Sequence, residues 1–148
     1  MLLRFLRAFE VGTPYSAVLS EVVETVRALG VVKLAVDRSG PGEAVYEHLT
    51  AELGAGVVEG FKFTAESKAE LLSGLKLLME EGCLALPFHK RLLAQLTSIT
   101  CELAPSGRLL LGHPPGKHDD LVMALALACW AARRPGGAAI GIWPRRGR

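Results

Sequence analysis

The sequence lacks most of the features that would place it in a specialised class of protein. Aromatic residues make up only 6% of the 148 residues, and the three cysteines form no C-x-x-C pair. An odd number of such cysteines supports neither a disulfide framework nor a zinc knuckle, so we expect reduced thiols in an apolar core. No apolar run reaches the ~18 residues of a membrane-spanning helix, and the first residues lack a signal-peptide cleavage site. These absences favour a cytoplasmic protein without a membrane anchor.

Apolar residues, in contrast, are abundant. They make up 50% of the chain against 22% charged residues, which suits one domain with a buried core. The net charge of +2 hides an asymmetry, since residues 133–148 hold five arginines and no acid. We therefore distinguish a domain over residues 1–132 from a basic tail over residues 133–148. Such a tail either contacts phosphate or only keeps the chain soluble.

Hydrophobic periodicity predicts alternating strands and helices. The predicted strands cover residues 2–10, 31–36, 57–63 and 83–86, with a hairpin over 100–103 and 108–111. The predicted helices cover residues 14–29 (after the cap Thr13), 43–53, 65–81 (after the cap Thr64), 88–97 and 118–132. This alternation indicates a mixed α/β fold with at least one right-handed strand–helix–strand unit.

Two groups of carboxylates stand where chemistry is common in such folds. Asp37 ends a predicted central strand, and ligands of open α/β sheets bind at that edge. Asp119 and Asp120 open an almost wholly apolar helix, whose dipole favours carboxylates there. Together they would suit Mg²⁺ or Mn²⁺, which prefer oxygen ligands. The alternative is that Asp37 only forms a turn and the aspartate pair only caps a helix.

Other candidates are weaker. Lys68 lies in the first turn of a predicted helix and could bind a phosphate or neutralise the carboxylates, although a solvated lysine is the alternative. His118 and His113 could contact a phosphate or the leaving group, although loop histidines are commonly solvated. Neither G-x-G-x-x-G nor G-x-x-x-x-G-K-[ST] occurs, so nucleotide binding by those motifs is not expected.

Four stretches, taken in order, resemble the nuclease domain of the large subunit of tailed-virus (phage) terminases. They are GTPYSAVLSEVV (12–23), VVKLAVDRSGPGEAVYEHL (31–49), VEGFKFTAESKAELLSGLKLLMEEG (58–82) and KHDDLVMALALA (117–128). The resemblance covers residues 5–132. It implies a ribonuclease H-like mixed sheet with flanking helices, in a virus- or provirus-encoded protein of the host cytoplasm.

The resemblance also implies roles for the acidic residues. Asp37 matches the metal ligand at the end of the family's fourth strand, and Asp119 and Asp120 match the acidic pair of its last helix. Two metal ions about 4 Å apart would activate a water and stabilise the leaving 3′ oxygen. The implied reaction is endonucleolytic cleavage of double-stranded DNA during packaging, and the implied partners are an ATPase motor or other packaging proteins.

The sequence departs from the family pattern at its start. Residues 2–10 resemble the family's third strand and hold no Asp, whereas the family begins with two earlier strands, the first of which carries an essential Asp. We therefore expect an N-terminally truncated relative with an incomplete metal site. Exposed sheet edges would favour a homodimer or a rearranged sheet.

Three functions stay open. The first is a metal-dependent endonuclease, which would lose activity when Asp37 or Asp120 is changed to Asn. The second is a catalytically impaired provirus remnant that binds DNA or a packaging partner, with steep salt dependence for DNA. The third is a structural remnant whose acids serve only as caps and turns.

Overall fold

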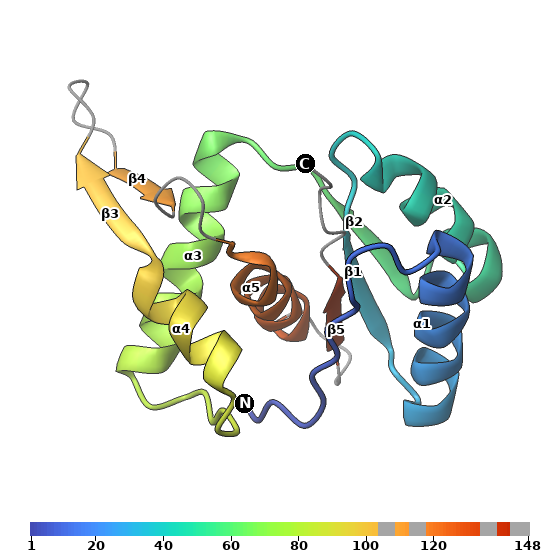
Figure 1. Cartoon of the computed structure of the whole chain (residues 1–148), viewed down its shortest axis with the longest axis horizontal. Coiled ribbons are helices and arrows are strands. Elements are labelled where there is room, and N and C mark those ends of the chain that lie inside the picture. Colours follow the sequence, from blue (N-terminus) through green and yellow to red (C-terminus); the bar gives the residue numbers. More distant parts are fainter. Residues whose placement is uncertain (104–108, 113–117, 134–138, 143–148) are drawn as a thin grey trace.

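The computed structural model describes residues 1–103, 109–112, 118–133 and 139–142 (Figure 1). The helices are α1 (Tyr15–Leu29), α2 (Gly42–Leu53), α3 (Ala65–Glu80), α4 (Lys90–Ser98) and α5 (Asp120–Ala132). The strands are β1 (Lys33–Asp37), β2 (Val58–Phe61), β3 (Thr100–Leu103), β4 (Leu109–Gly112) and β5 (Ala139–Ile142). The prediction of a mixed α/β fold is confirmed.

The central layer is a parallel sheet with the strand order β2-β1-β5. Helices α1 and α2 cover one face of this sheet, and α5 lies against the other face with α3 and α4 beyond it (Figure 1). Strands β3 and β4 form a separate antiparallel pair on the side of α3 and α4 (Figure 1). The core consequently has two parts, one on each face of the sheet.

Alternation along β1 decides which face each of its side chains reaches. Leu34 and Val36 pack in the apolar cluster of α1 and α2, whereas Ala35 packs in the cluster of α3, α4 and α5. Successive side chains of a strand point to opposite faces, so Asp37 shares the face of Ala35. The last residue of β1 therefore faces α5 rather than α2.

Small residues let α5 lie close to the sheet. Gly141 of β5 is paired with Ala35 of β1, beneath the helix. A Cβ atom at Gly141 would lie 2.0 Å from the carbonyl oxygen of Ala124 and 2.5 Å from the backbone nitrogen of Ala128. Any larger side chain at this position would have to push the helix and the strand apart.

The first turn of α5 is capped by a side chain from α4. Gln95 is buried, and its Oε1 accepts hydrogen bonds from the backbone N–H of Leu121 at 2.8 Å and of Val122 at 3.4 Å. Asp119 stands at the N-cap position but makes no side-chain cap hydrogen bond. The amide of Gln95 therefore satisfies N–H groups that an N-cap carboxylate would ordinarily bind.

Local sequence signals predicted the helices well. Thr64 caps α3 in a capping box with Ser67, whose backbone N–H donates to Thr64 Oγ1 at 3.1 Å. Helix α1 instead has Pro14 at its N-cap, and the Thr13 hydroxyl donates to the carbonyl of Glu10 at 2.8 Å. The strands of the predicted hairpin are confirmed as β3 and β4, while their connection, residues 104–108, lies outside the described residues.

Two predicted strands are wrong. Residues 2–10 and 83–86 are irregular apart from one isolated parallel bridge between Leu2 and Ala85. Leu3, Leu6 and Ala8 still pack against the core, so alternation reflects burial here without a strand partner. Conversely, β5 was not predicted, because it lies inside the segment 133–148 that was read as a basic tail.

The cysteines differ in environment. Cys129 is buried, as predicted, and burial raises the pKa of its thiol to about 11 because the interior disfavours a thiolate. Cys83 is exposed, so the prediction of a core thiol is wrong there. Within the described residues, no helix combines the length and the hydropathy needed to cross a membrane.

The contact beneath α5 can be tested with Gly141→Ala. We expect the free energy of unfolding to fall by about 1–3 kcal/mol, because the added methyl group overpacks a backbone contact. Urea unfolding measures the change. Gly56→Ala is the matched control, since a Cβ atom there meets nothing within 4 Å. Equal losses in both variants would contradict the close packing.

The capping role of Gln95 can be tested with Gln95→Leu, which keeps the volume and removes the acceptor. Leaving buried N–H groups of α5 without a partner should cost about 1–3 kcal/mol of stability, measured by urea unfolding. Thr97→Val on the same helix is the control, because the exposed Thr97 hydroxyl bonds only carbonyls of its own helix. An unfolding midpoint equal to that of the control would refute the role.

Candidate functional site

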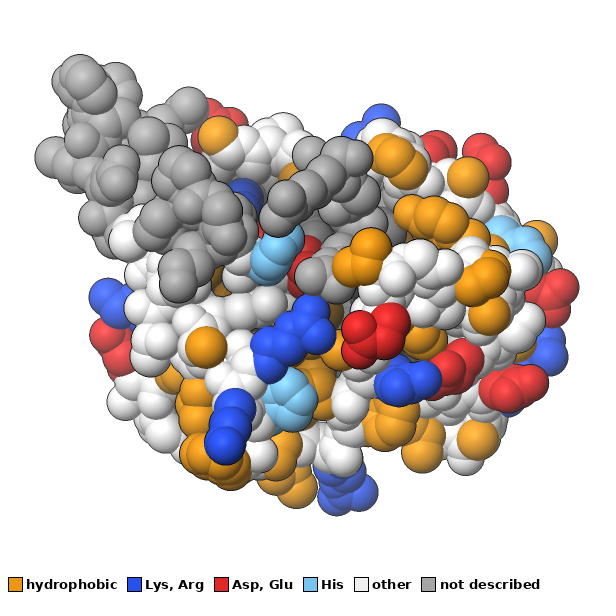
Figure 2. All heavy atoms as spheres, viewed as in Figure 1, with side chains coloured by type: hydrophobic (Ala, Val, Ile, Leu, Met, Phe, Trp, Pro, Cys, Tyr) orange, Lys and Arg blue, Asp and Glu red, His pale blue; other side chains and the backbone are white. Residues whose placement is uncertain are grey.

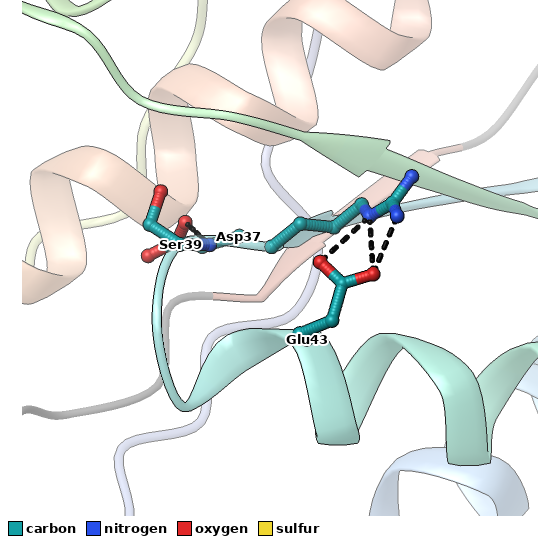
Figure 3. Close-up of polar contacts among 4 residues, drawn as sticks. Asp37, Ser39 and Glu43 are labelled. Carbon is teal, nitrogen blue, oxygen red and sulfur yellow. Dashed lines mark hydrogen bonds and ion pairs between the residues drawn. The ribbon is translucent and has the colours of Figure 1, made fainter.

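Asp37 lies at the carboxyl end of the central strand and is only 1% exposed. Its Oδ1 accepts a hydrogen bond from the backbone N–H of Ser39 at 2.7 Å (Figure 3). The turn-forming role considered from the sequence is thus present, because an aspartate that binds the backbone two residues on stabilises a turn. This contact also fixes the orientation of the carboxylate at the sheet edge.

Ser39 fastens that turn to the segment leading into α3. Its Oγ accepts a hydrogen bond from the backbone N–H of Phe63 at 3.0 Å. Phe63 directly precedes Thr64, the N-cap of α3, and Asp37 is paired with Phe61 in the β1–β2 ladder. The end of β1 and the first turn of α3 are therefore held side by side.

The first turn of α3 in turn meets the start of α5. Lys68 Nζ lies 2.8 Å from Asp119 Oδ2, and the two side chains are 27% and 8% exposed respectively. Asp119 benefits from the dipole of α5, whereas Lys68 stands where its own helix dipole disfavours a cation. Through Ser39, Phe63 and Lys68, Asp119 is brought to the same edge of the sheet as Asp37.

Two other predicted site residues, Asp120 and His118, are the chain neighbours of Asp119. Asp120 is half-buried in the first turn of α5, and His118 is exposed just before it. His113 falls outside the described residues. Within the described ranges, no three or more His, Cys, Asp and Glu side chains are gathered closely enough to hold a metal ion. Asp37 and Asp119 thus lie at the same edge of the sheet. Together with Asp120, they do not form a group of three ligands close enough to hold a metal ion.

The donor chemistry of this edge nevertheless fits a hard divalent cation. Asp37 and Asp119 are carboxylates buried on neighbouring elements, and carboxylate oxygen is the preferred ligand of Mg²⁺. The ammonium group of Lys68 occupies a position beside Asp119, so this edge already accommodates a positive charge. Asp37 and Asp119, with Asp120 next to them, are the residues that could hold a metal.

Arg38 follows Asp37 in the chain but belongs to the opposite face. Its guanidinium group forms an ion pair with Glu43 at 2.5 Å (Figure 3). The same group lies 4.2 Å from the ring centroid of Tyr46. The hydrogen bond between Arg38 and Glu43 raises the pKa of Arg38 and lowers the pKa of Glu43. A Cβ atom at Gly60 would lie 1.9 Å from Arg38 Cδ, so glycine makes room for the arginine stem. Arg38 is therefore anchored to α2 and does not offset the charge of Asp37.

Sequence reasoning missed Gln95, which caps α5 in place of Asp119. It also missed Ser39, which joins the turn after β1 to the segment leading into α3. No local pattern marks Gln95, because its partners lie on a different helix. Ser39 had a signal, since serine two residues after a strand-end aspartate is typical of a turn.

On the face seen in Figure 2, basic and His side chains gather near the middle, while acidic side chains lie mainly toward α1 and α2.

Comparison with known proteins gives related sequences. No protein-family model matches the chain. Relatives described as "Terminase, large subunit", from Thermus phage G20c and from Thermus virus P23-45, are each 33% identical over 119 residues. The match covers 74% of this chain and 23% of each relative, so the chain spans about a quarter of their length.

Solved structures give the same result. The large terminase nuclease of thermophilic phage G20c with bound cobalt has a TM-score of 0.69 at 30% identity, covering 80% of this chain and 63% of that one. The same nuclease with bound magnesium has a TM-score of 0.69 at 29% identity, covering 80% and 62%. The large terminase nuclease domain of Thermus phage P74-26 has a TM-score of 0.67 at 26% identity, covering 86% and 65%. The resemblance stated from the sequence is confirmed: over most of its length, the chain is a homologue of the nuclease domain of phage terminase large subunits.

Proposed function

We propose that this chain is a metal-dependent DNA endonuclease domain of the viral packaging type. The observation that carries the proposal is the arrival of two buried carboxylates, Asp37 and Asp119, at one edge of a parallel sheet from distant parts of the chain. The nuclease homologues, which were solved with bound cobalt and magnesium, support binding of a divalent cation by this domain. Mg²⁺ or Mn²⁺ is the proposed cofactor, and double-stranded DNA is the proposed substrate.

The fold proposed for this domain is ribonuclease H-like. The parallel strands β1 and β2, with the apolar helix α5 lying over β1, are consistent with it. In this proposal residues 1–132 hold the nuclease-type domain, and residues 133–148 contribute β5 and a basic end. An ATPase motor or other packaging proteins would be its partners, and a virus or provirus in a host cell its source.

In the proposed site, the chain's own residues position the carboxylates. Ser39 orients the Asp37 carboxylate, and Gln95 takes over the capping of α5 from Asp119. Asp120, in the same turn of α5, is the further proposed ligand. Asp37, Asp119 and Asp120 would hold a divalent cation, and the chemistry it would supply when bound is activation of a water and stabilisation of the leaving 3′ oxygen. Lys68 and the exposed His118 lie next to this edge, where they are proposed to meet DNA phosphate.

A second function is favoured by one observation. The described residues form no cluster of three or more His, Cys, Asp and Glu ligands, as a site already closed around a metal would. A relative that binds DNA or a packaging partner without cutting would have such an incomplete site. A homodimer that completes the sheet through its edges is part of the same alternative.

The nuclease proposal is tested by nicking of supercoiled plasmid in Mn²⁺, Mg²⁺ or EDTA. We expect metal-dependent nicking by the wild type, and a fall to the EDTA background for Asp37→Asn and for Asp119→Asn. Each substitution removes a charged oxygen ligand while it keeps the shape of the side chain. The control is Glu80→Gln, which removes an exposed carboxylate paired with Lys76 at the far end of α3.

Two other outcomes separate the alternatives. Wild-type protein that shifts DNA in a gel without nicking it, with a steep dependence on salt, would support the binding function instead. Nicking that persists in both aspartate variants would refute the assignment of these residues.

A further inference from the structure

We infer that Lys68 is a built-in counter-ion which a divalent cation must displace from Asp119. The inference rests on the proposed function, because it concerns the same carboxylate. It describes how metal binding at that site would be regulated, because the ammonium group of Lys68 and a divalent cation compete for the carboxylate of Asp119.

The geometry of the pair carries the inference. Lys68 Nζ lies 2.8 Å from Asp119 Oδ2, on a carboxylate that is almost fully buried. A carboxylate in such a place is costly without a positive partner, so the ammonium group stabilises the metal-free protein. A cation that binds the same oxygen meets a position that the ammonium group already occupies.

The surroundings of Lys68 make it suitable for release. Its side chain is 27% exposed, whereas that of Asp119 is 8% exposed, so the lysine lies on the solvent side of the pair. Lys68 also stands in the first turn of α3, where the helix dipole opposes a positive charge. Moving the ammonium group to water therefore relieves an unfavourable interaction and restores hydration, while the cation takes over the charge of Asp119.

This arrangement differs from that of another ion pair on α3, between Lys76 and Glu80. Lys76 and Glu80 are separated by 3.5 Å, and their side chains are 72% and 60% exposed. Such an exposed pair contributes little to stability. It therefore provides an internal control with the same residue type on the same helix.

The test measures Mn²⁺ binding to the full chain by titration calorimetry. The variants Lys68→Met and Lys76→Met are compared with the wild type. Methionine keeps much of the unbranched stem and removes the charge. We expect the dissociation constant for Mn²⁺ to fall about 10-fold in Lys68→Met, equivalent to ~1.4 kcal/mol, and to stay unchanged in Lys76→Met. Lys68→Arg, which keeps a competing cation, should bind Mn²⁺ as the wild type does.

Thermal unfolding supplies a second measurement that does not depend on nuclease activity. Lys68→Met should unfold at a lower temperature than the wild type in EDTA, because Asp119 loses its counter-ion. Added Mn²⁺ should raise its unfolding temperature by more than it raises that of the wild type. If Lys68→Met fails to fold in EDTA, Lys68→Gln, which retains a hydrogen-bond donor, takes its place in both measurements.

The outcomes distinguish this inference from the function on which it rests. Equal or weaker Mn²⁺ binding by the folded Lys68 variant, with clear binding by the wild type, would overturn the inference and leave the metal site intact. Binding by the variant alone would support the inference in its strongest form. Absence of Mn²⁺ binding in every protein would overturn both the inference and the proposed metal site.

Discussion

The close approach of α5 to the parallel sheet is the contact on which the rest of the structure depends. Helix α5 is apolar on nearly every side and lies over Ala35 and Gly141, two of the smallest residues available. Its burial forms the larger of the two apolar clusters. The same contact brings the first turn of α5, with Asp119 and Asp120, toward the edge where β1 ends. The packing of α5 against the sheet therefore forms the core and also positions the acidic residues of the candidate site.

Three polar contacts then turn that sheet edge into a candidate site. Ser39 orients Asp37, Gln95 caps the helix in place of Asp119, and Lys68 offsets the charge that Asp119 would otherwise bury alone. Each contact comes from a different element, so the site is held by tertiary structure rather than by one motif. The neighbouring Arg38 is kept out of it, because alternation along β1 sends that side chain to α2.

Relatedness to terminase nuclease domains gives these contacts a context. The similarity covers most of this chain but about a quarter of the curated relatives. In the proposed function, the two buried carboxylates at one sheet edge bind a divalent cation, and the ammonium group of Lys68 stabilises that edge without metal. In the proposed function, charge compensation by Lys68 and charge compensation by a cation would be two states of one site.

Local sequence alone determined the helices, the central strand and the candidate acids. Thr64 and Ser67 form a capping box within four residues, Gly30 ends α1 with a positive φ of 60°, and Asp37 is the last residue of β1. Such signals need no distant partner, which is why they could be read directly and why Asp37, Asp119 and Asp120 could be named as candidates. Only the tertiary structure decided the rest. Residues 2–10 alternate like a strand yet find no ladder partner, and β5 becomes a strand because β1 offers it an edge. Gln95 acquires its role from helix α5, and the ion pair with Asp119 decides between the charge-neutralising and the solvated alternatives for Lys68. A hydrogen bond or ion pair between distant segments is set by packing, and one-dimensional patterns do not record which segments pack together.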